Sequence, residues 1–225
     1  DSARVNIFNA ISLAYLELDS LPASADYSDS AIALASRSGF RKGQAYALKN
    51  KGLANYYQGK YLDVFDNWTQ SLTLFESIGD PLGIANMASN LGVIYYDQGS
   101  HDNALTYYFQ SLGMSEKLKD PRRITTALVN IGGVYSQMRD YDKALEYYTQ
   151  AYALSEKNGA KFGDPLNNIG NLHFNQGNYQ LAIAFYEKAL AIETEHDNQL
   201  GILNTIATRG NHAGGSARIR RDVAV

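Results

Sequence analysis

Apolar and small side chains recur along this chain with a helical spacing, and the whole pattern returns about every 40 residues. In the third segment the positions i, i+3, i+4 and i+7 of one helical face are Ala88, Leu91, Gly92 and Tyr95. The helical spacing starts again after the Gly99–Ser100 pair, which breaks the chain. Each segment therefore predicts two helices, a helix A and a helix B, joined by a short turn.

One glycine anchors the alignment of the segments. It follows an asparagine by two positions in four of them, at Asn50 and Gly52, Asn90 and Gly92, Asn130 and Gly132, and Asn168 and Gly170. The glycines are 40, 40 and 38 residues apart, and Ser12 holds the equivalent place in the first segment. Small residues such as Gly92 and Ala104 predict a close approach of the two helices. The aromatic residues Tyr95 and Tyr108 are expected to fill the volume between one segment and its neighbour.

The helix ends carry their own signals. Asp80–Pro81 and Asp120–Pro121 each place a capping carboxylate before a proline at the first helical position. Gly59, Gly99 and Gly177 are expected to close helix A in a left-handed conformation. In the fifth segment the Asp164–Pro165 pair lies much closer to its anchor glycine, so helix A is expected to start about a turn and a half late, after an irregular stretch.

This pattern resembles the tetratricopeptide repeat, and its 40-residue period is similar to the variant in kinesin light chains and bacterial signalling proteins. The opening Asp1–Asn6 resembles the first repeat of bacterial proteins that join such an array to a histidine kinase or nucleotide cyclase. The resemblance implies an all-α, right-handed superhelix, an α-solenoid of stacked antiparallel helical hairpins. The expected array spans residues 1–210, with units at about 1–40, 41–80, 81–120, 121–158, 159–198 and a partial sixth at 199–210. Residues 211–225 are expected to be a non-repeat basic tail.

The resemblance also implies that the A helices line a concave groove, and the helical period then selects the residues that face it. The expected peptide-binding positions are Asn50, Asn90, Asn130, Asn168, Lys49, Leu53, Tyr56, Tyr57, Ser89, Val93, Tyr96, Asp97, Asn171 and Phe174. The four asparagines share one slot, and each amide offers both donors and an acceptor. They predict a ladder of hydrogen bonds to the backbone of an extended peptide. The alternative is that these amides bond the neighbouring unit and only hold the stack together.

The charge of the expected groove limits its ligand. Lys49 is the only basic residue among these positions, so capture of a terminal carboxylate is not expected. A neutral or mildly basic extended segment suits the amides and Asp97 better. Four amide bonds at about 0.5–1.5 kcal/mol each fall short of the ~8 kcal/mol of micromolar binding, so side-chain contacts must supply the rest.

Composition and motifs exclude several classes of function. A hydrophobic fraction of 45% with 19% charged residues excludes a disordered chain, and the net charge of −3 argues against nucleic acid as the main partner. The chain has no cysteine, its four histidines are scattered, and it lacks phosphate-loop and nucleophile-elbow motifs. No cofactor, no metal, no direct membrane contact and no enzymatic activity are therefore expected.

The predicted function is a protein- or peptide-binding repeat module, the sensory or scaffold region of a larger bacterial signalling protein. The alternative is a structural scaffold that self-associates while its groove stays empty. The unfinished sixth unit would leave an apolar end face with Ile202, Leu203 and Ile206, through which a homodimer could form. The sequence does not decide between two compartments: the cytoplasm and, if the chain is the input region of a membrane sensor, the periplasm.

Overall fold

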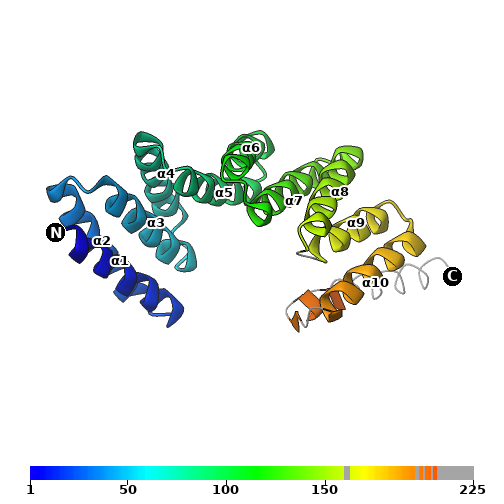
Figure 1. The fold of residues 1–225 in the computed structure, drawn as a ribbon, viewed down its shortest axis with the longest axis horizontal. Coiled ribbons are helices and arrows are strands. Elements are labelled where there is room, and N and C mark those ends of the chain that lie inside the picture. The colour runs from blue at the N-terminus through cyan, green and yellow to red at the C-terminus, as the bar shows by residue number, and fades with distance from the viewer. Residues whose placement is uncertain (160–162, 196–197, 200, 204, 207–225) are drawn as a thin grey trace. The chain divides into compact units, whose positions relative to one another are not determined.

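The computed structural model describes residues 1–159, 163–195, 198–199, 201–203 and 205–206, and these residues form helices and short turns without a strand (Figure 1). Ten helices have defined bounds within this part of the chain: α1 (Ser2–Glu17), α2 (Leu21–Ser38), α3 (Arg41–Tyr57), α4 (Tyr61–Ile78), α5 (Pro81–Asp97), α6 (His101–Lys117), α7 (Pro121–Gln137), α8 (Tyr141–Lys157), α9 (Asp164–Asn175) and α10 (Tyr179–Glu195). Successive helices pair as antiparallel hairpins. The predicted fold class, an all-α solenoid of helical hairpins, is confirmed.

The chain divides into two compact units, Asp1–Lys119 and Asp120–Val225. In the first unit the hairpins α1–α2, α3–α4 and α5–α6 pack in chain order, with α2 against α3, α4 against α5, and α1 against α3 (Figure 1). In the second unit α7–α8 packs on α9–α10 through contacts of α8 and α7 with α9. The tail expected at residues 211–225 lies outside the described residues.

The helix ends follow the sequence signals. The Asp80 carboxylate accepts hydrogen bonds from the backbone N–H groups of Leu82 and Gly83, at 3.1 and 3.0 Å, and Asp120 caps α7 in the same way. Such caps contribute about 1 kcal/mol each. Gly59, Gly99 and Gly177 have φ values of 72°, 72° and 80°, so all three end their helices in the left-handed region as predicted.

The late start of the fifth helix A is also confirmed. Helices α3, α5 and α7 each have 17 residues, whereas α9 begins at Asp164 and has 12. The difference of five residues corresponds to about 7.5 Å of helix, or roughly a turn and a half.

The anchor glycines make room for an aromatic ring of their own hairpin. A Cβ atom on Gly92 would lie 2.5 Å from the ring of Tyr108, and the same pairing joins Gly132 to Tyr148 and Gly170 to Tyr186. For Tyr108 this corrects the expectation of a side chain that fills the volume between neighbouring repeats. Tyr95 does both, because it stacks on Tyr107 of its own hairpin and makes an edge contact, with ring centres 5.7 Å apart, with Phe65 of the preceding hairpin. The reason is that helix B folds back directly onto the small face of helix A.

The first hairpin solves the same packing problem with hydroxyl groups. Ser12 takes the anchor position, and its Oγ is hydrogen-bonded to Ser28 Oγ at 2.8 Å and Ser24 Oγ at 3.1 Å. All three serines are fully buried. In the other hairpins the ring belongs to a residue 16 positions after the anchor, and here that residue is Ser28. A small polar cluster therefore replaces the glycine–aromatic contact.

Candidate functional site

The candidate site consists of the partly exposed faces that the A helices have in each of the two units, and the asparagine slot on these faces is not uniform. Asn50 is 4% exposed, and its Nδ2 donates to the backbone oxygen of Asn9 in α1 at 3.1 Å. Asn9 in turn donates to the backbone oxygen of Gly43 in α3 at 3.0 Å. This pair of amides therefore joins α1 to α3. The Asn50 amide bonds the neighbouring repeat and holds the stack together, which was the alternative to peptide binding.

The other three asparagines of the slot have a different environment. Asn90 in α5, Asn130 in α7 and Asn168 in α9 are partly exposed. Among the residues that the structure describes, no hydrogen-bond partner is found for any of their amides. These three amides are thus available to a ligand, whereas Asn50 is not.

In the first unit, the expected residues of α3 lie on a partly buried aromatic surface. The Lys49 ammonium lies 5.7 Å from the centre of the Tyr46 ring, and burial lowers its pKa. Leu53 and Tyr56 pack against the core cluster of the unit, where Tyr56 stacks on Trp68 with ring centres 6.0 Å apart. Tyr57 is 62% exposed and makes an edge contact with Tyr56. This end of α3 is therefore an aromatic, mostly uncharged surface.

The expected residues of α5 adjoin that surface. Ser89, Val93 and Tyr96 are partly buried and Asp97 is exposed. Leu53 and Tyr56 of α3 pack against a core cluster that includes Leu91 and Ile94 of α5. Burial, followed by the negative charge of Asp97, raises the pKa of Tyr56. The first unit thus brings together the expected positions of α3 and α5, apart from Asn50.

In the second unit, two of the expected residues are engaged by α10. The Tyr186 hydroxyl donates to Asn171 Oδ1 at 2.7 Å, and the Phe174 ring lies 5.1 Å from the ring of Tyr179. Asn167, next to Asn168, is buried and donates from Nδ2 to the Thr205 hydroxyl at 2.8 Å. Asn168, by contrast, keeps an amide without an internal partner among the described residues.

A pocket of about 500 Å³ lies between α7 and α9, and Asn130 and Val129 are part of its wall. The remaining wall residues are Arg122, Thr125, Thr126, Asp164 and Pro165. Sequence reasoning treated Asp164 and Pro165 only as a helix start. The signal that could have identified the pocket is the late start of α9, because the pocket lies at the end where α9 begins.

The profile of the tetratricopeptide repeat matches residues 83–157 and again residues 164–195, which together cover α6 to α10 and nearly all of α5. The same hairpin geometry continues through α1–α4. The chain is a tetratricopeptide-repeat protein. No curated protein sequence matches it significantly.

Solved structures of similar fold share little sequence with this tetratricopeptide-repeat protein. The apo form of RapI is 17% identical with a TM-score of 0.76, covering 86% of this chain and 72% of its own. A Rap protein complexed with Competence and Sporulation Factor is 16% identical with a TM-score of 0.67, covering 90% of this chain and 57% of its own. The nearly identical TPR-like repeats of a putative kinesin light chain from Podosopora anserina give 12% identity and a TM-score of 0.72, covering 87% and 97%. At these identities the likeness establishes the fold alone.

The described part of this repeat protein offers few groups for chemistry. It contains no cluster of three or more His, Asp or Glu side chains that could hold a metal ion. No helix among the described residues is long and apolar enough to cross a membrane. His173, which takes a position held by tyrosine in other repeats, stacks on Phe185 with ring centres 5.4 Å apart. The absence of catalytic activity stays a prediction.

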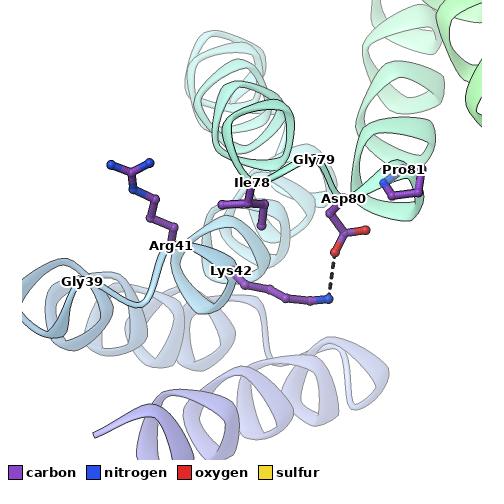
Figure 2. Close-up of a pocket in the computed structure, with 7 residues that line it drawn as sticks. All are labelled: Gly39, Arg41, Lys42, Ile78, Gly79, Asp80 and Pro81. Carbon is purple, nitrogen blue, oxygen red and sulfur yellow. Dashed lines mark ion pairs between the residues drawn. The ribbon is translucent and has the colours of Figure 1, made fainter.

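A second hollow of about 640 Å³ lies in the first unit, where the ends of α2 and α4 meet the starts of α3 and α5 (Figure 2). Its charged groups already pair with each other: Lys42 Nζ lies 2.8 Å from Asp80 Oδ2, and Arg41 points away from this pair. Burial opposes the ionisation of Asp80, but the hydrogen bonds from Lys42, Gly83 and Leu82 outweigh it and lower its pKa. At this hollow the ion pair therefore links the start of α3 to the start of α5.

The Lys42–Asp80 pair predicts a pH-dependent contribution to stability. Because the pKa of Asp80 is lowered on folding, its contribution is present above the unfolded pKa of about 4 and is lost as pH falls through the lower folded value. Asp80→Asn keeps a good capping side chain but removes the charge. We expect the variant to melt about 1–2 °C below wild type at pH 7, with the difference vanishing near pH 2–3. Thermal melts followed by circular dichroism measure this, and a difference that persists at pH 2 contradicts it.

Proposed function

We propose that this protein binds an extended peptide segment of a partner protein along the exposed faces of its A helices. The observation that carries the proposal is the set of amides at Asn90, Asn130 and Asn168, which are partly exposed and have no hydrogen-bond partner among the described residues. Because these amides are not already bonded within the protein, a peptide backbone can pair with them without breaking an internal hydrogen bond. As a tetratricopeptide-repeat protein the chain is an interaction module, and the peptide is the ligand that this face suits.

The three amides alone do not account for useful affinity. At about 0.5–1.5 kcal/mol each they contribute roughly 1.5–4.5 kcal/mol, and micromolar binding needs ~8 kcal/mol. Val93, Tyr96 and the exposed Tyr57 in the first unit, and Phe174 in the second, supply apolar surface for the remainder. With Asp97 exposed and Lys49 half-buried, the preferred segment is neutral or mildly basic.

The proposed context is the sensory or scaffold region of a larger bacterial signalling protein. The 40-residue period and the opening residues 1–6 support it through their resemblance to such proteins. One protein of similar fold was solved in complex with Competence and Sporulation Factor, so this fold is compatible with binding a factor of that kind. In this role the array acts by recognition, with no catalytic step of its own.

The amide proposal is tested with peptides selected from a random dodecapeptide display library on the 225-residue chain. We expect Asn90→Ala and Asn168→Ala each to weaken the selected peptides about 3- to 10-fold by calorimetry, with the melting temperature changed by less than about 2 °C. Asn103→Ala, on the exposed face of helix B, is the matched control and should leave affinity unchanged. Asn50→Ala should instead lower the melting temperature, because it removes the bond to Asn9.

The opposite pattern would contradict the amide proposal. If Asn90→Ala and Asn168→Ala lower the melting temperature and leave peptide affinity intact, these amides hold the stack as Asn50 does. Failure to select any peptide that competes for the A-helix face would also contradict it.

A second candidate function is self-association through the C-terminal end. Leu203 is 63% exposed and Ile206 52% exposed, while Ile202 is partly buried. Exposed apolar side chains at the end of a repeat array favour pairing with another copy. Light scattering of the chain with and without residues 199–225 decides this: a dimer that disappears on deletion supports an end-to-end contact, and a monomer in both cases excludes it.

A further inference from the structure

The pocket between α7 and α9 has the features of a site for one particular side chain. One wall is the α7 surface from Arg122 to Asn130, and the other is formed by Asp164 and Pro165 at the start of α9. Its volume of about 500 Å³ lies within the usual range of small-ligand pockets. All of its wall residues belong to the second unit, so the site is complete within that unit.

Thr125 carries an unused hydrogen-bonding group at this pocket. The residue is 5% exposed, and its hydroxyl oxygen is buried without a hydrogen-bond partner. The neighbouring Thr126 differs, because its hydroxyl donates to the backbone oxygen of Arg122 at 3.0 Å. Threonine has two accessible χ1 rotamers in a helix, so the Thr125 hydroxyl can turn to a ligand without moving the backbone. A ligand that pairs with this oxygen relieves an unfavourable state of the free protein.

The electrostatic balance of the pocket favours a cation. Burial raises the pKa of Asp164, and the negative charge of Glu193 adds to this effect. Glu193 is itself 2% exposed and accepts a hydrogen bond from the backbone N–H of Gly163, next to Asp164. On the pocket wall the Asp164 carboxyl group opposes the charge of Arg122, both of them solvent-exposed, and Glu193 adds negative charge from beside Asp164, outside the wall.

We propose that this pocket binds the guanidinium group of an arginine side chain. The Asp164 carboxylate, the Thr125 hydroxyl oxygen and the Asn130 amide oxygen are three acceptors around the pocket, and a guanidinium presents five donors in a fixed plane. Val129 and Pro165 provide apolar contact for the methylene stem. The inference rests on the proposed peptide function, since the arginine would be carried by the bound segment.

The charge requirement is tested with small probes that need no peptide ligand. We expect N-acetyl-arginine amide, titrated into the ¹⁵N-labelled 225-residue chain, to shift the backbone resonances of Thr125, Asn130 and Asp164 with a Kd near the millimolar range. N-acetyl-citrulline amide has nearly the same shape without the charge, and should bind at least 5-fold more weakly. Asp164→Asn should reduce arginine binding by a similar factor. Equal binding of the two probes, or shifts unaffected by Asp164→Asn, overturns the proposal.

A threonine pair separates binding from folding. Thr125→Val removes the unpaired hydroxyl while keeping its shape, so it should raise the melting temperature and weaken the arginine probe about 3-fold or more. Thr69→Val is the matched control, because Thr69 also has a buried hydroxyl without a partner but lies on α4 in the first unit. It should raise the melting temperature and leave probe binding unchanged. Loss of binding in both variants, or in neither, contradicts a role for Thr125.

The outcome is distinguishable from that of the peptide proposal. If the binding of the selected peptides depends on Asn168 but the peptides show no preference for arginine, the peptide proposal stands and the arginine-pocket proposal is overturned. Arginine-probe binding that depends on Asp164 and Thr125, in a chain that selects no peptide, supports the pocket as a site independent of the groove.

Discussion

Gly92→Ala is expected to lower the free energy of unfolding by about 2 kcal/mol, although alanine is the better helix former. The added Cβ would lie 2.5 Å from Cε1 of Tyr108, a ring that is only 3% exposed and has little room to move. Overpacking of this kind costs roughly 1–3 kcal/mol or more, which outweighs the ~1 kcal/mol that alanine gains over glycine in a helix. Denaturant unfolding and thermal melts measure the change, with a fall in melting temperature of roughly 4–8 °C.

Gly113→Ala is the matched control for this prediction. Gly113 lies inside α6, and a Cβ there would meet nothing within 4 Å. The same chemical change should therefore stabilise the protein, by up to about 1 kcal/mol. A double-mutant cycle of Gly92→Ala with Tyr108→Leu should show a coupling energy of about 0.5–3 kcal/mol, because the smaller side chain relieves the clash. If Gly92→Ala and Gly113→Ala have the same effect, the glycine–ring contact does not set the hairpin spacing.

Glu193→Ala is expected to destabilise the last hairpin by about 2–3 kcal/mol. Glu193 is 2% exposed, and its carboxylate accepts hydrogen bonds from the backbone N–H of Gly163 and from Asn198 Nδ2. Removing the carboxylate leaves a buried N–H without a partner at the point where α9 begins, and creates a cavity beside Gly201. A charged run such as Glu193–Thr194–Glu195 is typical of a solvated helix face, yet Glu193 is buried.

The expected signature of Glu193→Ala is local. Hydrogen exchange of the α9 and α10 amides should accelerate, while exchange in the first unit stays unchanged. Glu193→Gln keeps one acceptor oxygen and should lose less, about 1 kcal/mol. Thr194→Ala, at an exposed neighbouring position, should stay within about 0.5 kcal/mol of wild type. Unchanged exchange at Gly163 in Glu193→Ala would show that this carboxylate does not hold the start of α9.

Most of the fold could be predicted from the sequence because its signals are local or strictly periodic. The Asp80–Pro81 and Asp120–Pro121 caps, the left-handed glycines and the late start of α9 depend on backbone chemistry within a few residues. The recurrence every 40 residues then identified the tetratricopeptide family and the helix pairing. Each of these features is a property of one hairpin, so it needed no knowledge of what the hairpin packs against.

The candidate site could be predicted only in part, because the partners of its side chains come from helices about 40 residues away. Helical periodicity placed Asn50 and Asn90 in the same slot, yet α1 packs on α3 so that the Asn50 amide donates to the backbone oxygen of Asn9, while the Asn90 amide has no partner among the described residues. Nothing in the local sequence distinguishes the two. The same holds for Glu193, whose burial depends on Gly163 and Gly201.

The sequence by itself determined the repeat, the helix boundaries and which face of each helix carries small, aromatic or amide side chains. Only the tertiary structure decided which of those amides are already bonded and which aromatic ring packs against each glycine. It also decided that the short α9 leaves a pocket beside Thr125 and Asp164. The physical reason is that spacing along a helix fixes the direction of a side chain, whereas its hydrogen-bond partner and its burial depend on the helix that packs against it.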